Sequence, residues 1–479
     1  MTHPFWRIKP VPPPATVDAE PHRRVLSAWH LVALGIGVTV GAGLFSLTGI
    51  AAGSYAGPAV TLSFLIAAIA CAFAGLCYAE LAGMIPTSGS SYSYAYSSLG
   101  ELAAWVIGWD LMLEYTVNAA AVASSWSGYV RSLLGGWGLQ LDPRLTASPG
   151  SLVTLSDGTV AHGWLNAPSV VIVLAVTLLM LRGTRQSARV NTILVILKVL
   201  VLLAFVALCV PFLDKGHFTP FVPANTGVFG ALGWSGIMRA AGMVFFAFIG
   251  FEVVSTMTKE TKNPQRNIPI GLLGTVAACA IIYVIFAFVL VGVVPWAQLA
   301  NDPNPVATAM NAAHQRALGQ FVKLGITIGY ISVVYGLLLG QSRILTAMAD
   351  DGLLPPAFSA MTKSTQTPWV AVVVSATLAA LLAAFVPLRV LGNMTSIGTL
   401  LAFVLVCAGV MIMRHTNPTA QRSFRVPGGP WVIPALGVLC CSVVMASMDG
   451  RTWLQLFLWL LAGLVVYLCY GMRHSQLNK

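Results

Sequence analysis

The feature of this sequence that most limits its fold is a series of long apolar runs with almost no charge inside them. A helix that crosses a membrane needs about 20 mostly apolar residues, and twelve segments fit this description. They cover residues 29–52, 58–85, 92–133, 168–181, 190–212, 234–257, 270–294, 321–348, 368–386, 396–413, 431–448 and 453–472. The runs are continuous, whereas membrane barrels alternate apolar and polar residues in segments of about ten. We therefore expect an all-α integral membrane protein with 12 transmembrane helices, the third too long for one straight span.

Charged side chains are too scarce for a water-soluble protein of this size. Of the 479 residues, 57% are hydrophobic and only 9% are charged, against about 25% charged in a typical soluble domain. A soluble surface with so few charges would be one aggregating apolar patch. The composition excludes soluble, disordered, fibrous and disulfide-scaffold classes, and it makes the lipid bilayer the main partner of this surface.

Basic residues predict how the chain is oriented. Lys and Arg outnumber Asp and Glu by 26 to 15. With the N-terminus inside, 17 basic residues fall on the cytoplasmic side, six outside and three within spans. The positive-inside rule then predicts a multi-pass protein of the plasma membrane (a bacterial inner membrane) with both termini cytoplasmic, residues 1–28 forming an N-terminal tail. Because the charge is spread over many loops, we expect no nucleic-acid partner.

The sequence contains no evident motif for catalysis or metal binding. All eight cysteines fall within spans, and no Cys/His spacing resembles a metal site. Neither a nucleotide-binding P-loop nor a nucleophile–base constellation is evident. We therefore expect no enzyme activity, no metal and no cofactor.

Glycines interrupt the first and the sixth apolar segment. Four glycines stand within Gly35-Ile-Gly-Val-Thr-Val-Gly-Ala-Gly43, and each costs about 1 kcal/mol relative to alanine in a helix. In the sixth segment Gly250 is followed by an acid, Glu252. Close helix packing through small residues is one interpretation. Interruptions at corresponding positions of two halves favour another, a transporter binding site at mid-membrane, because unwound backbone must line a polar cavity.

A broken helix offers both signs of partial charge. Free N–H groups after the break suit a carboxylate, and free carbonyls before it suit an ammonium, so the breaks predict an amino acid site. The predicted substrate-binding residues at the breaks are Thr39, Val40, Gly41, Ala42, Gly43, Phe246, Ala247, Ile249 and Glu252.

Several motifs resemble the amino acid–polyamine–organocation (APC) superfamily and, within it, the cationic amino acid transporter family. Gly41-Ala-Gly-Leu-Phe45 resembles the family's helix break, and residues 245–256 with 260–266 resemble its sixth-helix signature and following loop. Further matching motifs lie at residues 86–92, 108–115, 351–355 and 424–427. The resemblance spans about residues 25–459. It implies amino acid substrates and an APC/LeuT-type five-plus-five inverted repeat, with repeats at 29–212 and 213–415 and two additional helices in 416–479.

Four positions bear on substrate choice. The eighth helix is expected to line the side-chain pocket, where Leu337 and Leu338 offer no acceptor for a cationic side chain. Arg239, where the family is usually uncharged, is either a vestibule residue that disfavours cationic substrates or a side chain that snorkels to the interface. Glu252 stands where the family usually has Asp. The two leucines favour small or medium neutral L-amino acids. Lys323, at the outer end of the eighth helix, is expected to snorkel.

Lys198 lies about nine residues into the fifth span. A charge at this depth is costly and marks a functional hypothesis. Its register resembles the lysine that replaces the sodium ion in proton-coupled relatives, which implies that it bridges the broken first helix to the fifth. Glu114, Tyr115 and Tyr283 are its predicted partners in proton coupling, with a static buried network as the alternative. We expect the proton to be the coupling ion and no sodium site.

Together these features predict a secondary active importer that works by proton symport and alternating access. An amino acid exchanger and a cationic amino acid transporter remain alternatives. A sensor that binds without transport is a third, although the tails of about 28 and 7 residues leave little room for a signalling domain. The oligomeric state stays open, with a monomer as one possibility.

Overall fold

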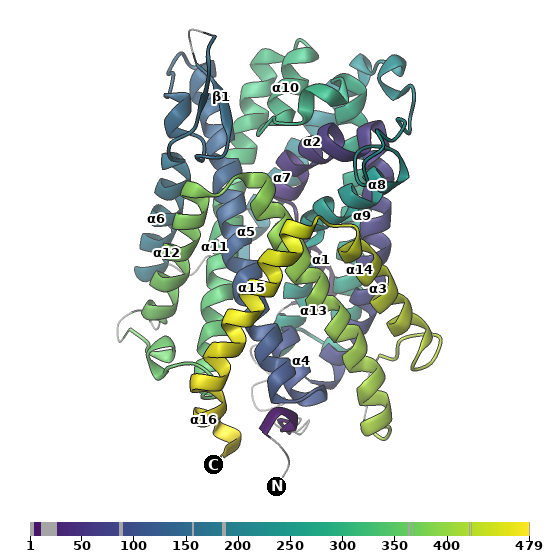
Figure 1. Ribbon diagram of the computed structural model, residues 1–479, viewed down its shortest axis with the longest axis vertical. Helices are drawn as coiled ribbons and strands as arrows, with labels where there is room; N and C mark the ends of the chain where they lie inside the picture. Colours follow the sequence, from purple (N-terminus) through teal and green to yellow (C-terminus); the bar gives the residue numbers. More distant parts are fainter. Residues whose placement is uncertain are drawn as a thin grey trace.

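The structure is a computed structural model that describes residues 4–10, 26–85, 90–155, 158–183, 188–362, 365, 367–420, 422 and 424–478. The family-like motif at residues 86–92 therefore lies partly outside the described residues. Helices dominate, and most run along the long axis of the molecule (Figure 1). Only one sheet is present in these ranges, an antiparallel pair of β1 (Leu152–Thr154) and β2 (Val160–His162).

The α-helices follow the predicted apolar segments. They are α1 (Ala28–Thr39), α2 (Thr48–Ala51), α3 (Val60–Met84), α4 (Ser90–Ser98), α5 (Glu101–Gly136), α6 (Ala167–Leu181), α7 (Ala188–Cys209), α8 (Gly233–Val244), α9 (Pro264–Val293), α10 (Pro305–Ala312), α11 (Arg316–Asp350), α12 (Trp369–Phe385), α13 (Leu388–Thr416), α14 (Val432–Ala446), α15 (Gly450–Val466) and α16 (Met472–His474). Each of the twelve predicted segments overlaps at least one of them.

Many of these helices have the length and composition of membrane spans. Seven helical segments of the described chain are long and apolar enough to cross a bilayer, and four further apolar helices are shorter. Large apolar side chains point outward, such as Leu200 on α7, Leu381 on α12 and Phe457 on α15. An outward apolar surface of this kind is stable against lipid tails and not against water, so the protein is a multi-pass helical membrane protein.

The third apolar segment, too long for one straight span, is divided between two helices. α4 ends at Ser98 and α5 begins at Glu101, with Gly100 between them at φ +102°. That backbone conformation favours glycine. A Cβ at Gly100 would also lie 3.1 Å from the carbonyl oxygen of Phe5, so the N-terminal segment packs directly on this turn.

Both ends of the chain lie at the same end of the bundle, whereas β1 and α10 lie at the opposite end (Figure 1). Contacts join the two ends: the rings of Phe5 and Tyr467 are 6.2 Å apart. Glu101, at the start of α5, accepts hydrogen bonds from the Tyr467 hydroxyl at 3.0 Å and the Ser475 hydroxyl at 2.6 Å. The N-terminal and C-terminal segments therefore share one surface of the molecule.

Candidate functional site

The first break lies where α1 ends. Val40 leaves the helix with an extended backbone (φ −74°, ψ 105°), and helical turns resume at Gly43. The N–H groups of Leu44 and Phe45 both donate to the Gly41 carbonyl, at 3.2 and 3.1 Å. Among the described residues, nothing bonds to the N–H groups at positions 41–43 or to the carbonyls at positions 38–40. The predicted break is confirmed, and it has both the free donors and the free acceptors that the sequence indicated.

The second break follows α8. Tight helical turns cover Phe245–Phe248, Ile249 is extended (φ −63°, ψ 135°), and Gly250 has φ +110°. A second helical segment then covers Phe251–Glu260. The Gly250 N–H donates to Glu252 Oε2 at 2.9 Å, while Oε1 of the same carboxyl group is buried without a partner in the described structure. One oxygen of Glu252 thus stabilises the break, and the other is available to a ligand.

The two breaks touch each other. A Cβ at Gly43 would lie 2.4 Å from the Ala247 Cα, and a Cβ at Gly250 would lie 2.8 Å from Cγ1 of Val38. Such an approach is possible only without side chains at these two positions. Residues predicted from two distant stretches of sequence are therefore adjacent in space.

The predicted substrate-binding residues at the breaks lie inside the protein. Each predicted substrate-binding residue at the breaks is buried, and Thr39 and Ile249, at 4% exposed, are among the most accessible. The Thr39 hydroxyl has no hydrogen-bond partner within the described ranges. A buried polar group is thus left over for a ligand.

α11 forms the wall opposite the first break. The Val333 methyl groups would lie 3.7 Å from a Cβ at Gly41, and Leu337 follows one helical turn later on the same face. Leu337 and Leu338 are 2% and 0% exposed. The structure places this stretch of α11 beside the break, as expected for a side-chain pocket.

Lys198 reaches the broken helix from α7. Its Nζ donates to the Gly37 carbonyl at 2.7 Å. Its side-chain carbons pack against Gly329 on α11, where an added Cβ would lie 3.0 Å from them. This hydrogen bond joins α7 to the broken first helix, the contact that the family resemblance implied. Lys198 is 2% exposed, and no carboxylate of the described chain lies within 4.0 Å of it.

The other predicted coupling residues are buried but do not form one chain of contacts with Lys198. Glu114 Oε1 has no partner in the part of the chain that is described. The Tyr283 hydroxyl donates to the Ala247 carbonyl at 2.7 Å, at the second break. The Tyr115 ring lies against Gly340 of α11. Tyr283 therefore belongs to the breaks, and a direct ion pair between Glu114 and Lys198 is not formed in this structure.

A hydroxyl network beside the first break was missed in the sequence. Ser46 bonds to Ser125 on α5 and donates to the Pro303 carbonyl at 2.8 Å. Ser125 in turn bonds to the Tyr330 hydroxyl at 3.0 Å, and Tyr129 donates to the Phe45 carbonyl at 2.6 Å. The network closes the break on the side of the loop before α10. Serines in helices often bond to their own backbone, so the sequence had no signal for these pairings.

Two charged side chains on the helices, Glu80 and Arg239, have clear partners. Glu80 on α3 accepts from Arg414 Nε at 2.8 Å and from the Val426 N–H at 2.8 Å, and Arg422 forms a second ion pair at 3.2 Å. Arg239 donates to the Ser447 carbonyl at 3.2 Å and stacks over the Phe229 ring. Arg239 thus extends to the connectors at the end of its helix, which favours the snorkelling interpretation over a vestibule role.

Known proteins similar to this chain are transporters. The amino acid permease family matches residues 26–468. A branched-chain amino acid permease of Bacillus subtilis (strain 168) is 42% identical over 465 residues, which cover 97% of each chain. A methylthioribose transporter of the same organism is 40% identical over 456 residues, 95% of each chain. Cationic amino acid transporter 2, vacuolar, of Arabidopsis thaliana is 39% identical over 400 residues, which cover 83% of this chain and 61% of that protein.

The match to the family covers nearly all of the described helices, both breaks included. The extent of the match agrees with the motifs around Gly41 and Gly250. The members of this family are transporters and not enzymes. The chain therefore belongs to the amino acid permease family of the APC superfamily.

Proposed function

We propose that this protein imports neutral amino acids of small or medium size across the plasma membrane by proton symport. The observation that carries the proposal is the hydrogen bond from Lys198 Nζ to the Gly37 carbonyl. It connects a group that can gain and lose a proton to the helix that holds the candidate substrate site. When the ammonium loses its proton, its attraction for that carbonyl weakens, and the first helix is freer to move.

The chemistry of the breaks supports an amino acid as the substrate. Free N–H groups at Gly41, Ala42 and Gly43 suit a carboxylate, since the N-terminus of a helix binds anions. Free carbonyls at positions 38–40 suit an ammonium. Leu337 on the facing wall of α11 suits an apolar side chain, and a branched-chain amino acid permease is among the similar proteins. L-Leucine is therefore the first substrate to test.

The proposed architecture is twelve spans with a five-plus-five inverted repeat. Support comes from the match between the twelve apolar segments and the helices, and from breaks in the first helix of each proposed repeat (29–212 and 213–415), with residues 416–479 adding two more spans. The basic residues support cytoplasmic termini. A proton replaces sodium as the coupling ion in this proposal, no cofactor takes part, and a monomer suffices for transport.

The test is uptake of L-leucine into proteoliposomes that contain no internal amino acid. An inward proton gradient should drive accumulation, and dissipation of the gradient should abolish it. Lys198→Met should bind L-leucine yet transport it without dependence on the gradient, because methionine fills the space without a titratable group. Full gradient-driven uptake by K198M would contradict the role of Lys198.

A cationic amino acid transporter is a second candidate, because two buried carboxyl groups near the breaks, Glu114 and Glu252, each have an oxygen without a partner among the described residues. L-Arginine uptake that exceeds L-leucine uptake would favour it. An exchanger would require internal amino acid in the same vesicles, and a sensor would bind substrate without flux.

A further inference from the structure

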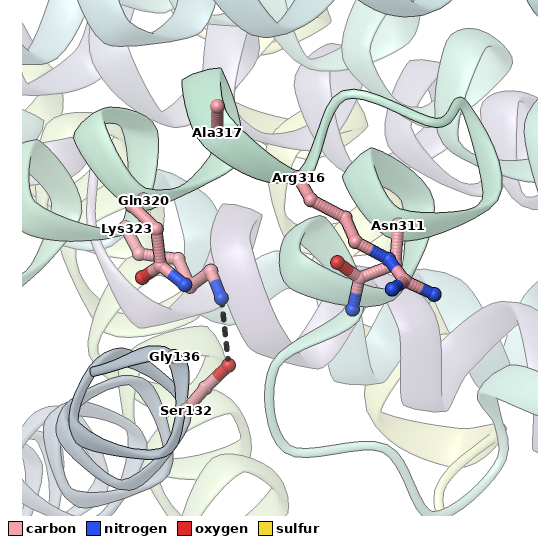
Figure 2. Close-up of a pocket in the computed structure, with 7 residues that line it drawn as sticks. All are labelled: Ser132, Gly136, Asn311, Arg316, Ala317, Gln320 and Lys323. Carbon is pink, nitrogen blue, oxygen red and sulfur yellow. Dashed lines mark hydrogen bonds between the residues drawn. The ribbon is translucent and has the colours of Figure 1, made fainter. Parts of the chain in front are cut away.

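A cavity at the end of the molecule opposite the termini has an unusual charge. It has a volume of about 440 Å³ and lies between the end of α5, α10 and the start of α11. Its lining includes two cations, Arg316 and Lys323, and no acid. Figure 2 shows Lys323 and Gln320 on one side of the cavity and Arg316 and Asn311 on the other. The cavity is therefore a positively charged hollow with amide groups around it.

Lys323 does not snorkel as its position in the sequence predicted. It is 4% exposed, and its Nζ donates to the Ser132 hydroxyl at 3.3 Å. No carboxylate of the described residues lies within 4.0 Å of either Lys323 or Arg316. A buried ammonium whose partner is a neutral hydroxyl is poorly compensated. An anion in the cavity would provide the missing charge.

The start of α11 adds to the positive potential. Arg316 is the first residue of this 35-residue helix, which has no acid in its first turn and no side-chain cap at Gln315. The N-terminus of a helix carries a partial positive charge, so a cation there is unfavourable unless an anion binds nearby. The N-terminus of α11 therefore favours an anionic ligand, as do the side chains of Arg316 and Lys323.

We propose that this cavity is an outer docking site for the carboxylate of an incoming amino acid, which binds there before it reaches the broken helices. This inference rests on the proposed function. Val333, which contacts the first break, lies ten residues beyond Lys323 on the same helix, about 15 Å along its axis. Tyr330, on the same face of α11, belongs to the hydroxyl network that closes the break. A substrate in the cavity would therefore wait on the outer side of this closure.

The experiment compares wild type with Arg316→Gln, Lys323→Gln and the double variant in the L-leucine uptake assay. The double variant should raise KM about three- to tenfold, as expected for the loss of two guiding charges, and leave kcat unchanged. Added salt should raise KM in the wild type and have little effect in the double variant. 4-Methylpentanoate, which has the carboxylate without the amine, should inhibit the wild type more strongly than the double variant.

Arg451→Gln is the matched control, because Arg451 is exposed at the start of α15 and does not line the cavity. An unchanged KM in both R316Q and the double variant would overturn the docking site. R316Q keeps the test valid if K323Q misfolds, because Arg316 is exposed and its substitution should not disturb folding. The assays are run in phosphatidylcholine vesicles with and without phosphatidylglycerol. A difference between wild type and variants that needs phosphatidylglycerol would assign the cavity to a lipid headgroup and contradict the proposal. Absence of wild-type uptake would instead contradict the proposed function.

Discussion

Among single residues, Gly43 has no room for a side chain, because the backbone of the second break lies directly against it. A Cβ there would lie 2.4 Å from the Ala247 Cα and 2.7 Å from its nitrogen. Backbone atoms cannot turn aside as a flexible side chain can, so Gly43→Ala must push the two breaks apart. We expect G43A to lose about 1–3 kcal/mol of stability and most of its L-leucine uptake. Thermal unfolding in detergent and uptake in proteoliposomes measure the two effects.

Gly336 provides the control for this substitution. It lies inside α11, and a Cβ there would meet no atom within 4 Å. Alanine is favoured over glycine in a helix by up to about 1 kcal/mol, so G336A should be at least as stable as the wild type and equally active. Equal behaviour of G43A and G336A would show that the contact between the breaks does not matter for transport.

Between elements, Glu80 joins α3 to the connector that follows α13. Its carboxyl group is 1% exposed and faces Arg414 and Arg422, whose side chains are 12% and 4% exposed. Removing one partner of a buried ion pair costs about 3–5 kcal/mol, because the remaining charge stays buried. Glu80→Gln should therefore lower the midpoint of thermal unfolding strongly.

The exposed pair between Lys9 and Asp351 serves as the comparison. Their nitrogen and oxygen are 2.5 Å apart, but the Lys9 side chain is 46% exposed, and solvent-exposed pairs contribute about 0–1 kcal/mol. Lys9→Gln should thus change the unfolding midpoint much less than E80Q does. If the two variants were equally stable, burial would not determine the strength of the Glu80 contacts.

The elements differ in how well the sequence predicted them. Continuous apolar runs located the helices, and the glycines around positions 41 and 250 located both breaks, because these signals are local. The contacts of Glu80 and Ser46 were not predictable. Arg414 is 334 residues away from Glu80, and nothing in the local pattern of a serine tells whether it bonds to its own helix or to a neighbour. The snorkelling predicted for Lys323 was wrong for a related reason. The cavity that it lines is built from three separate helices, which the local sequence does not show to be neighbours.

For the molecule as a whole, the ends of the chain and the hairpin β1–β2 lie at opposite ends of the bundle (Figure 1). The basic residues predict that the ends are cytoplasmic, which makes the hairpin and the cationic cavity external. Trp6 and Leu152 are 68% and 66% exposed, one near each end. In intact cells a membrane-impermeant maleimide should label Leu152→Cys, and it should label Trp6→Cys only after the membrane is permeabilised.

The eight native cysteines set the background of this measurement. Six are buried, Cys440 is partly exposed, and Cys469 is exposed on the helical segment after α15, so the unmodified protein is labelled in parallel and subtracted. The opposite pattern, with W6C labelled in intact cells, would invert the topology. It would also place the cavity of Arg316 and Lys323 on the cytoplasmic side, where it would meet amino acids leaving the protein. The labelling of these two positions therefore decides whether the cavity can receive a substrate before import.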